Sequence, residues 1–190
     1  CLNWGCIPTK ALLRSAELYE VLQEAAAYGF TVGKLGFDAG KIVARSRQVA
    51  DKMTRGVGAL FRKYRVEHLA GTARFVAPQR LEVAAEGGQT RTIEARHVII
   101  AAGARPRRSE ALPVDHQTVL DYRDALALKK FPKKLLIVGA GAIGVEFAYY
   151  FAAFGVEVHL VEVLPQLLPT EDAEIADLLS LEVRTVLRGL

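Results

Sequence analysis

The chain has 190 residues, a length that allows one large domain or two small ones. Hydrophobic residues make up 51% of it and the net charge at neutral pH is +4, a composition typical of an ordinary globular protein. No apolar run reaches the roughly 18 residues that a membrane span needs. The densest basic runs, Arg105–Arg108 and Lys129–Lys134, lack the aromatic platform or motif of a nucleic-acid site. We therefore expect neither membrane insertion nor nucleic-acid binding.

Both cysteines of the chain lie in its first ten residues, Cys1-Leu-Asn-Trp-Gly-Cys6-Ile-Pro-Thr-Lys10. Two cysteines are too few for the disulfide framework of a secreted protein, so they are either unrelated buried thiols or a redox pair. A disulfide needs Cα atoms about 4.4–6.8 Å apart. Residues five apart on an ideal helix are farther apart and point away from each other. The pair must therefore straddle a turn or a distorted helix start.

The residues around the cysteines favour the redox pair. Gly5 supplies a permissive backbone, and Pro8 suits the first turn of a helix. Cys6 would then lie near a helix N-terminus, where a thiolate is stabilised, and Lys10 adds positive charge one turn later. A stabilised thiolate beside a second thiol is what disulfide exchange requires.

Two helices are expected next. Lys10–Tyr28 carries apolar residues at helical spacing, and Gly29 is a fitting residue just past its end. Asp38 can cap a second helix that runs to about Tyr64. Two glycines weaken the last turns of that helix.

The apolar period then changes to that of strands. Short β-leaning runs separated by Gly, Pro and Gln predict strands at Val66–Ala70, Ala73–Val76, Leu81–Ala84, Arg91–Ala95 and His97–Ala101. The last run is continuously apolar, as expected of a strand buried on both faces. The polar, proline-bearing stretch Arg105–Pro113 that follows is the expected domain boundary.

The second half of the chain predicts a βαβ unit. Its parts are a strand at Leu135–Val138, a turn at Gly139–Gly144, a helix at Ile143–Phe154 and a strand at Glu157–Val161. The turn reads Gly-Ala-Gly-Ala-Ile-Gly, directly after a strand and opening a helix, which is where a dinucleotide-binding turn must lie.

Each glycine of the turn has an expected task. Gly139 permits the tight turn, Gly141 lets the backbone approach a pyrophosphate, and Gly144 lets helix and strand pack closely. The helix N-terminus offers unpaired N–H groups to the phosphates.

Glu162 indicates which nucleotide binds. It ends the second strand, 18 residues after Gly144, where an acidic side chain hydrogen-bonds the adenine ribose hydroxyls and repels a 2′-phosphate. The alternative is a Gly-rich turn followed by a surface Glu. The strand, the glycine-rich turn, the helix and Glu162 all lie at the spacings that such a site requires. The sequence therefore favours NAD(H) over NADP(H).

Together these motifs resemble those of the pyridine nucleotide–disulfide oxidoreductases, along essentially the whole chain and in the order of that family. The segment Cys1–Leu13 resembles its redox-active segment, most closely the form found in dihydrolipoamide dehydrogenases. Gly139–Glu146 followed by Val161-Glu162 is similar to its NAD-binding segment. His97–Pro106 is similar to the strand and turn that return to the FAD.

The resemblance implies an α/β protein built of Rossmann-like FAD- and NAD(P)-binding domains, present in part. Residues 1–110 would form a partial FAD-binding domain with the redox-active helix, and residues 111–190 an NAD-binding domain truncated at its C-terminus. The chain opens on Cys1 instead of Met and stops within helix-like sequence. We therefore expect a piece that lacks the family's first FAD motif and its C-terminal interface domain with the acid/base His.

The resemblance also implies roles for residues. Cys1 would exchange with the substrate, Cys6 would be the thiolate facing the flavin, and Lys10 would lie near the flavin, paired with Glu146. Cofactor contacts are implied for Lys10, Ala73, Ala102, Gly103, Ala104, Gly139, Ala140, Gly141, Ala142, Ile143, Gly144, Glu146 and Glu162. Ala102 departs from the Thr of many relatives and loses a hydroxyl contact. No metal ligand is implied.

The implied reaction converts dihydrolipoamide and NAD⁺ to lipoamide and NADH through the Cys1–Cys6 disulfide and FAD. Implied partners are the lipoyl domain of a 2-oxo acid dehydrogenase complex and a second subunit in a homodimer. The implied compartment is a bacterial cytoplasm or an organelle matrix. Alternatives are a mercuric or glutathione-type reductase and a nucleotide-binding piece that is inactive by itself. A thioredoxin-like protein would need Cys-x-x-Cys, whereas four residues separate these cysteines.

Overall fold

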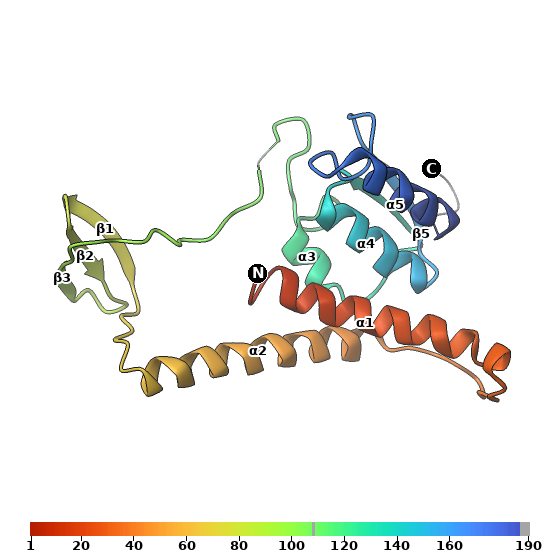
Figure 1. The fold of residues 1–190 in the computed structure, drawn as a ribbon, viewed down its shortest axis with the longest axis horizontal. Helices are drawn as coiled ribbons and strands as arrows, with labels where there is room; N and C mark the ends of the chain where they lie inside the picture. Colours follow the sequence, from red (N-terminus) through yellow and green to blue (C-terminus); the bar gives the residue numbers. More distant parts are fainter. Residues whose placement is uncertain (108, 187–190) are drawn as a thin grey trace. The chain divides into compact units, whose positions relative to one another are not determined.

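The computed structural model describes residues 1–107 and 109–186, which belong to two compact units (Figure 1). Unit 1 combines Cys1–Thr54 with the segment from Arg108 onward, and unit 2 is Arg55–Arg107. The border at Arg107 falls inside the expected boundary stretch, Arg105–Pro113. The border at Thr54 lies within a helix, and no sequence signal predicted it. The division at residue 110 into two cofactor domains stays a prediction.

Helices dominate unit 1, and strands dominate unit 2. The helices are α1 (Cys6–Gln23), the 3₁₀ turn η1 (Ala25–Tyr28), α2 (Ala39–Lys63), α3 (Tyr122–Ala127), α4 (Ala142–Ala153) and α5 (Ala173–Val186). The strands are β1 (Thr72–Ala77), β2 (Arg80–Ala84), β3 (Thr90–Glu94), β4 (Lys134–Val138) and β5 (Glu157–Val161). No helix of the described residues is long and apolar enough to cross a membrane.

The first helix differs from its expected bounds at both ends. It begins at Cys6, four residues before Lys10, and gives way after Gln23 to the single turn η1. Gly29 adopts the left-handed conformation, with φ +79°, and its N–H donates to carbonyls of the preceding turn. The expected glycine end of the helical segment is thus confirmed, but the segment is α-helical only in part.

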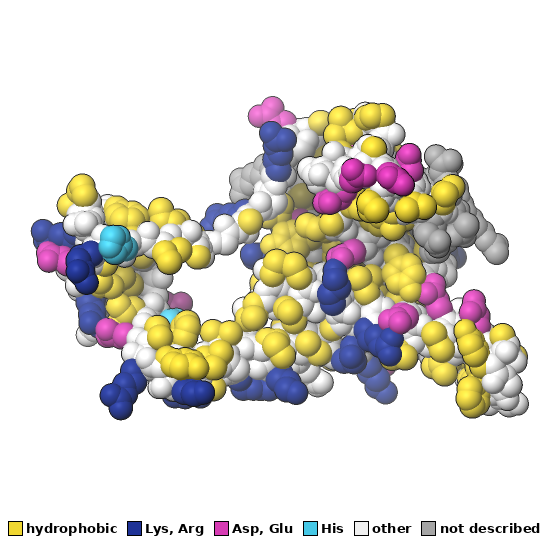
Figure 2. Space-filling model, in the orientation of Figure 1, with side chains coloured by type: hydrophobic (Ala, Val, Ile, Leu, Met, Phe, Trp, Pro, Cys, Tyr) yellow, Lys and Arg dark blue, Asp and Glu magenta, His cyan; other side chains and the backbone are white. Residues whose placement is uncertain are grey.

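The second helix starts as expected. The Asp38 carboxylate accepts a hydrogen bond from the Lys41 N–H (3.0 Å), and the helix then runs from Ala39 to Lys63. Its buried residues recur at helical spacing and are Ala39, Val43, Ser46 and Ala50. The last turns bury none of the described side chains, and Figure 2 shows apolar atoms exposed over them.

The βαβ unit forms as expected around α4. Strands β4 and β5 are parallel neighbours, in register from Lys134 opposite Glu157 to Val138 opposite Val161. Helix α4 packs on β5 and against α1 (Figure 1). Buried side chains of these elements form the core of unit 1, among them Leu12, Ala16, Phe147, Ala148, Tyr150, Phe151, Phe154, Val158 and Leu160.

Unit 2 contains a three-stranded antiparallel sheet in the order β1-β2-β3. Thr72 lies opposite Ala84, and Arg80 lies opposite Glu94. The first hairpin turns at Gln79, whose φ is +64°, and the second contains two glycines with positive φ. These strands confirm three of the five expected ones.

The other two expected strands do not form. Val66–Ala70 and His97–Ala101 are irregular, and the side chains of Ile99 and Ile100 are 91% and 76% exposed. A strand requires a hydrogen-bonded neighbour, and no described strand pairs with either segment. The apolar run His97–Ala101 therefore lacks the two covered faces that its composition predicted.

Candidate functional site

The residues between the two cysteines fold back over the start of α1. The Cys1 carbonyl accepts a hydrogen bond from the Ile7 N–H (3.2 Å), and the Gly5 carbonyl accepts bonds from the N–H and the hydroxyl of Thr9 (3.1 and 2.8 Å). A Cβ on Gly5 would lie 2.9 Å from the Cys1 Cα, so only glycine permits this approach. The turn at the helix start that the cysteine spacing predicted is present.

Cys6 is the first residue of α1, and both cysteines are free and exposed in this structure. The first-turn N–H groups and the partial positive charge of the helix N-terminus favour an anionic sulfur at such a position. An exposed pair of thiols beside a helix N-terminus can undergo disulfide exchange with a substrate from solution.

An ion pair joins the dithiol helix to the helix of the glycine-rich turn. Lys10, one turn after Cys6, contacts the Glu146 carboxylate of α4 through its Nζ. The Lys10 side chain is 62% exposed, so the pair contributes little to stability. Its significance is geometric: the pair fixes an ammonium group between the dithiol and the βαβ unit.

The glycine-rich turn has the geometry that its motif predicts. Gly139 has φ +100°, a left-handed conformation, and its N–H donates to the Val161 carbonyl (2.8 Å). A Cβ on Gly144 would lie 2.0 Å from the Gly139 carbonyl oxygen, because α4 and the end of β4 approach closely there. Gly141 has φ −70° with open space where a Cβ would point.

The turn suits a dinucleotide phosphate. Helix α4 begins at Ala142 without a side-chain cap, which leaves first-turn N–H groups directed outward. Ile143 is 60% exposed at this end. Backbone donors at a helix N-terminus beside an uncovered glycine form an anion site.

Glu162 lies at this turn. One carboxylate oxygen accepts a hydrogen bond from the Ala140 N–H (2.8 Å), and the other accepts from Val163 and Leu164 (2.7 and 3.0 Å). The Ala140 N–H, followed by that of Leu164, holds the pKa of the Glu162 carboxyl below its usual value. The carboxylate is therefore charged at neutral pH, and the oxygen that accepts from Ala140 alone retains acceptor capacity for a hydroxyl.

The residues whose backbone is expected to contact FAD, Ala73 and Ala102–Ala104, lie in unit 2. Ala73 is exposed in β1, where it pairs with Val83, and Ala102–Ala104 lies outside every described strand. Gly103 has φ +83°, a backbone conformation that favours glycine. No strand pairing among the described residues connects Ala73 with Ala102–Ala104.

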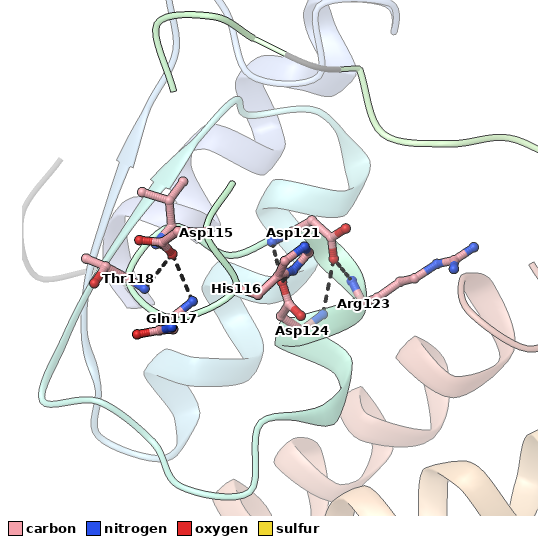
Figure 3. Close-up of polar contacts among 8 residues, drawn as sticks. Asp115, His116, Gln117, Thr118, Asp121, Arg123 and Asp124 are labelled. Carbon is pink, nitrogen blue, oxygen red and sulfur yellow. Dashed lines mark hydrogen bonds and ion pairs between the residues drawn. The ribbon is translucent and has the colours of Figure 1, made fainter. Parts of the chain in front are cut away.

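A polar network at the start of α3 was not foreseen (Figure 3). Asp121 caps the helix, accepting from the N–H groups of Arg123 and Asp124, while the Asp124 carboxylate accepts from the Asp121 N–H (2.9 Å). The signal was readable, because an acidic residue three positions after a capping Asp marks a capping box. His116 Nδ1 lies 2.9 Å from the Asp124 carboxylate, and the hydrogen bond raises the pKa of His116.

The three side chains of this network do not require a metal. His116, Asp121 and Asp124 offer ligand atoms within 4.8 Å of one another. Both carboxylates already accept backbone hydrogen bonds, however, and the imidazole pairs with one of them. Helix capping accounts for the arrangement.

Comparisons with known proteins bear on the whole chain. Residues 1–185 match the family described as pyridine nucleotide-disulphide oxidoreductase. A protein of Zymomonas mobilis named dihydrolipoyl dehydrogenase is 49% identical over 176 residues, which cover 93% of this chain and 38% of the relative. One of the same name from Bacillus subtilis is 38% identical over 180 residues, covering 94% and 39%. The mitochondrial dihydrolipoyl dehydrogenase of Pisum sativum is 35% identical over 176 residues, covering 92% and 35%.

A solved structure is similar as well. The crystal structure of LpdA from Mycobacterium tuberculosis has a TM-score of 0.89 to this chain at 27% identity, covering 100% of this chain and 42% of that one. The expected α/β class with Rossmann-type domains is confirmed. The chain spans about two fifths of the length of these relatives.

Proposed function

The chain belongs to the pyridine nucleotide-disulphide oxidoreductase family, and from this premise we propose that it supplies the dithiol and the NAD site of a dihydrolipoyl dehydrogenase. The observation that carries the proposal is the connection within unit 1: the helix that starts at Cys6 is ion-paired through Lys10 to Glu146 of α4, the helix that opens at the glycine-rich turn. The dithiol that would accept electrons and the turn that would bind NAD therefore lie at the starts of two helices that pack together.

The exchange step uses the Cys1–Cys6 disulfide. A thiolate of dihydrolipoamide attacks the Cys1 sulfur, the S–S bond breaks, and Cys6 leaves as a thiolate. The second substrate thiol, after losing its proton, attacks the substrate sulfur bound to Cys1, which releases lipoamide and a Cys1 thiolate. The substrate dithiol is oxidised, the protein disulfide is reduced, and two protons are released. The N-terminus of α1 stabilises the departing Cys6 thiolate.

The cofactor residues follow the same proposal. Lys10, Ala73 and Ala102–Ala104 would hold FAD, and Gly139–Gly144 with Glu162 would hold NAD. Bound flavin and nicotinamide would carry the electron pair from the dithiol to the final acceptor. The close packing at Gly144 and the free donors of α4 support the NAD part. Residues 1–110 would contribute to the flavin domain and residues 111–190 to the nicotinamide domain.

Further partners belong to the proposal as well. A lipoyl domain would deliver the substrate, and a second subunit would complete a homodimer. The compartment would be a bacterial cytoplasm or an organelle matrix, in line with the bacterial and plant mitochondrial relatives.

Substrate turnover tests the activity. The complete gene product, loaded with FAD, should reduce NAD⁺ with dihydrolipoamide, and Cys1→Ser and Cys6→Ser should each abolish the reaction. Oxidised glutathione and Hg²⁺ with NADPH serve as comparison substrates. Faster turnover with either one would replace dihydrolipoyl dehydrogenase by another reductase of the family.

Selective alkylation tests the separate roles proposed for Cys1 and Cys6. Limiting iodoacetamide added to the reduced, FAD-loaded protein should label Cys1 before Cys6, because Cys6 would face the flavin while Cys1 stays open to the substrate, as peptide mass spectrometry can show. A label mainly on Cys6 would reverse the assigned roles.

Nucleotide preference tests Glu162. Glu162→Ala should weaken the binding of NADH more than that of NADPH, because it removes the carboxylate that would bind the ribose hydroxyls and repel a 2′-phosphate. Glu157→Ala, at the exposed first residue of β5, the strand that Glu162 follows, is the matched control. An unchanged ratio of the two dissociation constants would remove Glu162 from the nucleotide site.

A further inference from the structure

The loop between the two cysteines is anchored by a helix distant in sequence. Arg47 of α2 donates from Nη2 to the Asn3 carbonyl (2.6 Å), and the Thr54 hydroxyl donates to the Asn3 side-chain oxygen (3.0 Å). Asn3 is the second residue after Cys1 and the third before Cys6. Both of its carbonyl groups are therefore held by α2.

The next residue of the loop is held by the same arginine. The guanidinium carbon of Arg47 lies 4.5 Å from the centre of the Trp4 ring, and that of Arg123 lies 5.7 Å from it. Arginine stacks on aromatic faces through its planar cation. The Arg47 Nε is buried without a hydrogen-bond partner among the described residues, and the guanidinium contacts the Asn3 carbonyl through Nη2 and the Trp4 ring through its face.

These contacts act on the dithiol through the loop backbone. At its C-terminal end the loop is already constrained, because Gly5 lies against the Cys1 backbone. The anchors on Asn3 and Trp4 constrain its middle. Whether two thiols form a disulfide depends on how often their sulfur atoms meet. Both cysteines are free in this structure, but Cys1 is folded back against Gly5, next to Cys6, so a loop held in this conformation raises that frequency by removing extended alternatives.

We propose that Arg47 is a positioning residue of the Cys1–Cys6 pair: by holding Asn3 and Trp4, it favours the disulfide and so sets the dithiol–disulfide equilibrium. This proposal rests on the proposed function, in which that pair is oxidised and reduced in each cycle. Arg47 touches neither sulfur in the described contacts and acts only through the loop.

The equilibrium constant is the measurement that tests it. The complete gene product and its Arg47→Ala and Arg47→Lys variants are equilibrated in glutathione buffers of graded redox ratio. Their thiols are then alkylated, and the oxidised fraction of Cys1–Cys6 is read by mass spectrometry. We expect Arg47→Ala to lower the equilibrium constant for the disulfide about tenfold, which raises the potential of this two-electron couple by about 30 mV.

Arg47→Lys should fall between the parent and Arg47→Ala, because an ammonium keeps a donor and a charge but loses the planar stacking. The lysine variant also keeps the test valid if the alanine variant does not fold. Arg55→Ala, an exposed residue of the same helix without a hydrogen bond or ion pair among the described residues, is the control and should match the parent.

Coupling to Trp4 separates positioning from a general loss of structure. Arg47→Ala should change the equilibrium constant for the disulfide less in a Trp4→Leu background, because the contact between Arg47 and the Trp4 ring is already lost there. If both Arg47 variants match the parent, Arg47 has no positioning role. If the two effects add fully, Arg47 does not act by holding Trp4, and the proposal as stated is overturned. In both cases the disulfide and the proposed function stand. If Cys1 and Cys6 form no disulfide in the parent protein, the proposed function fails first and this proposal with it.

Discussion

Replacing Gly144 by Ala should disrupt the turn between β4 and α4. The new methyl carbon would lie 2.0 Å from the Gly139 carbonyl oxygen, whereas real contacts of this kind essentially never fall under 3.0 Å. The obstacle is backbone, so no side chain can rotate away, and α4 must move from the strand. A clash with backbone belongs at the upper end of the cost of overpacking, about 3 kcal/mol.

One opposing effect must be subtracted. Ala is favoured over Gly within a helix by about 1 kcal/mol, so the net loss of unfolding free energy is about 2 kcal/mol. For a folded chain of 190 residues that corresponds to a fall of about 4–8 °C in the unfolding temperature. NADH affinity should fall as well, because the turn that would receive the phosphates is displaced.

Gly141→Ala is the matched control for this substitution. Gly141 has φ −70°, which any residue can adopt, and a Cβ there would meet nothing within 4 Å. Stability should change by no more than about 0.5 kcal/mol, while NADH affinity falls because the methyl occupies the space of the phosphate. Thermal unfolding and NADH fluorescence titration measure the two quantities separately. An unchanged unfolding temperature for Gly144→Ala would refute the packing argument, and unchanged affinity for Gly141→Ala would refute the phosphate site.

Two further predictions concern stability alone. The pKa of His116 is raised above its ordinary 6.5 in the folded protein, so its pairing with Asp124 stabilises fully below pH 6.5 and is lost as pH rises through the folded value. His116→Asn, which tolerates the φ of +60°, should lower the unfolding temperature at about pH 6 and hardly at about pH 9; equal losses at both would contradict the pair. Tyr149→Phe removes a hydrogen bond to Glu20 and should cost about 1 kcal/mol. Tyr150→Phe, which removes a buried hydroxyl with no partner among the described residues, should be neutral or stabilising in urea unfolding; a larger loss there than for Tyr149→Phe would overturn this account.

Local signals predicted the βαβ unit closely. The expected second strand, Glu157–Val161, matches β5, and the first differs from β4 by one residue. Residues within or next to each element predict it: apolar runs predict the strands, the glycine-rich motif predicts the turn, and a glycine marks the end of the helix. The same kind of signal located the glycine turn at Gly29 and the cap at Asp38.

The sequence failed where structure depends on distant partners. His97–Ala101 has a strand's composition, but composition does not provide the neighbour that a strand must pair with. Apolar spacing alone placed the start of the first helix at Lys10, whereas Gly5 and Pro8 correctly placed a helix N-terminus near Cys6. Arg47 was missed because its contact with Asn3 joins residues 44 positions apart, and no local pattern marks it.

The fold-back of Cys1 over Gly5 also bears on how often the protein can be oxidised and reduced without harm. A bond between Cys1 and Cys6 closes a loop of six residues, and loop entropy gives such a bond about 2 kcal/mol of stabilisation, against about 4.7 kcal/mol for a 100-residue loop. The core of unit 1 includes Leu12 and Ala16 of α1 as well as the aromatic residues of α4, but it contains neither cysteine. Stability and reactivity thus depend on different residues, so that the bond can open and close repeatedly while the core stays intact.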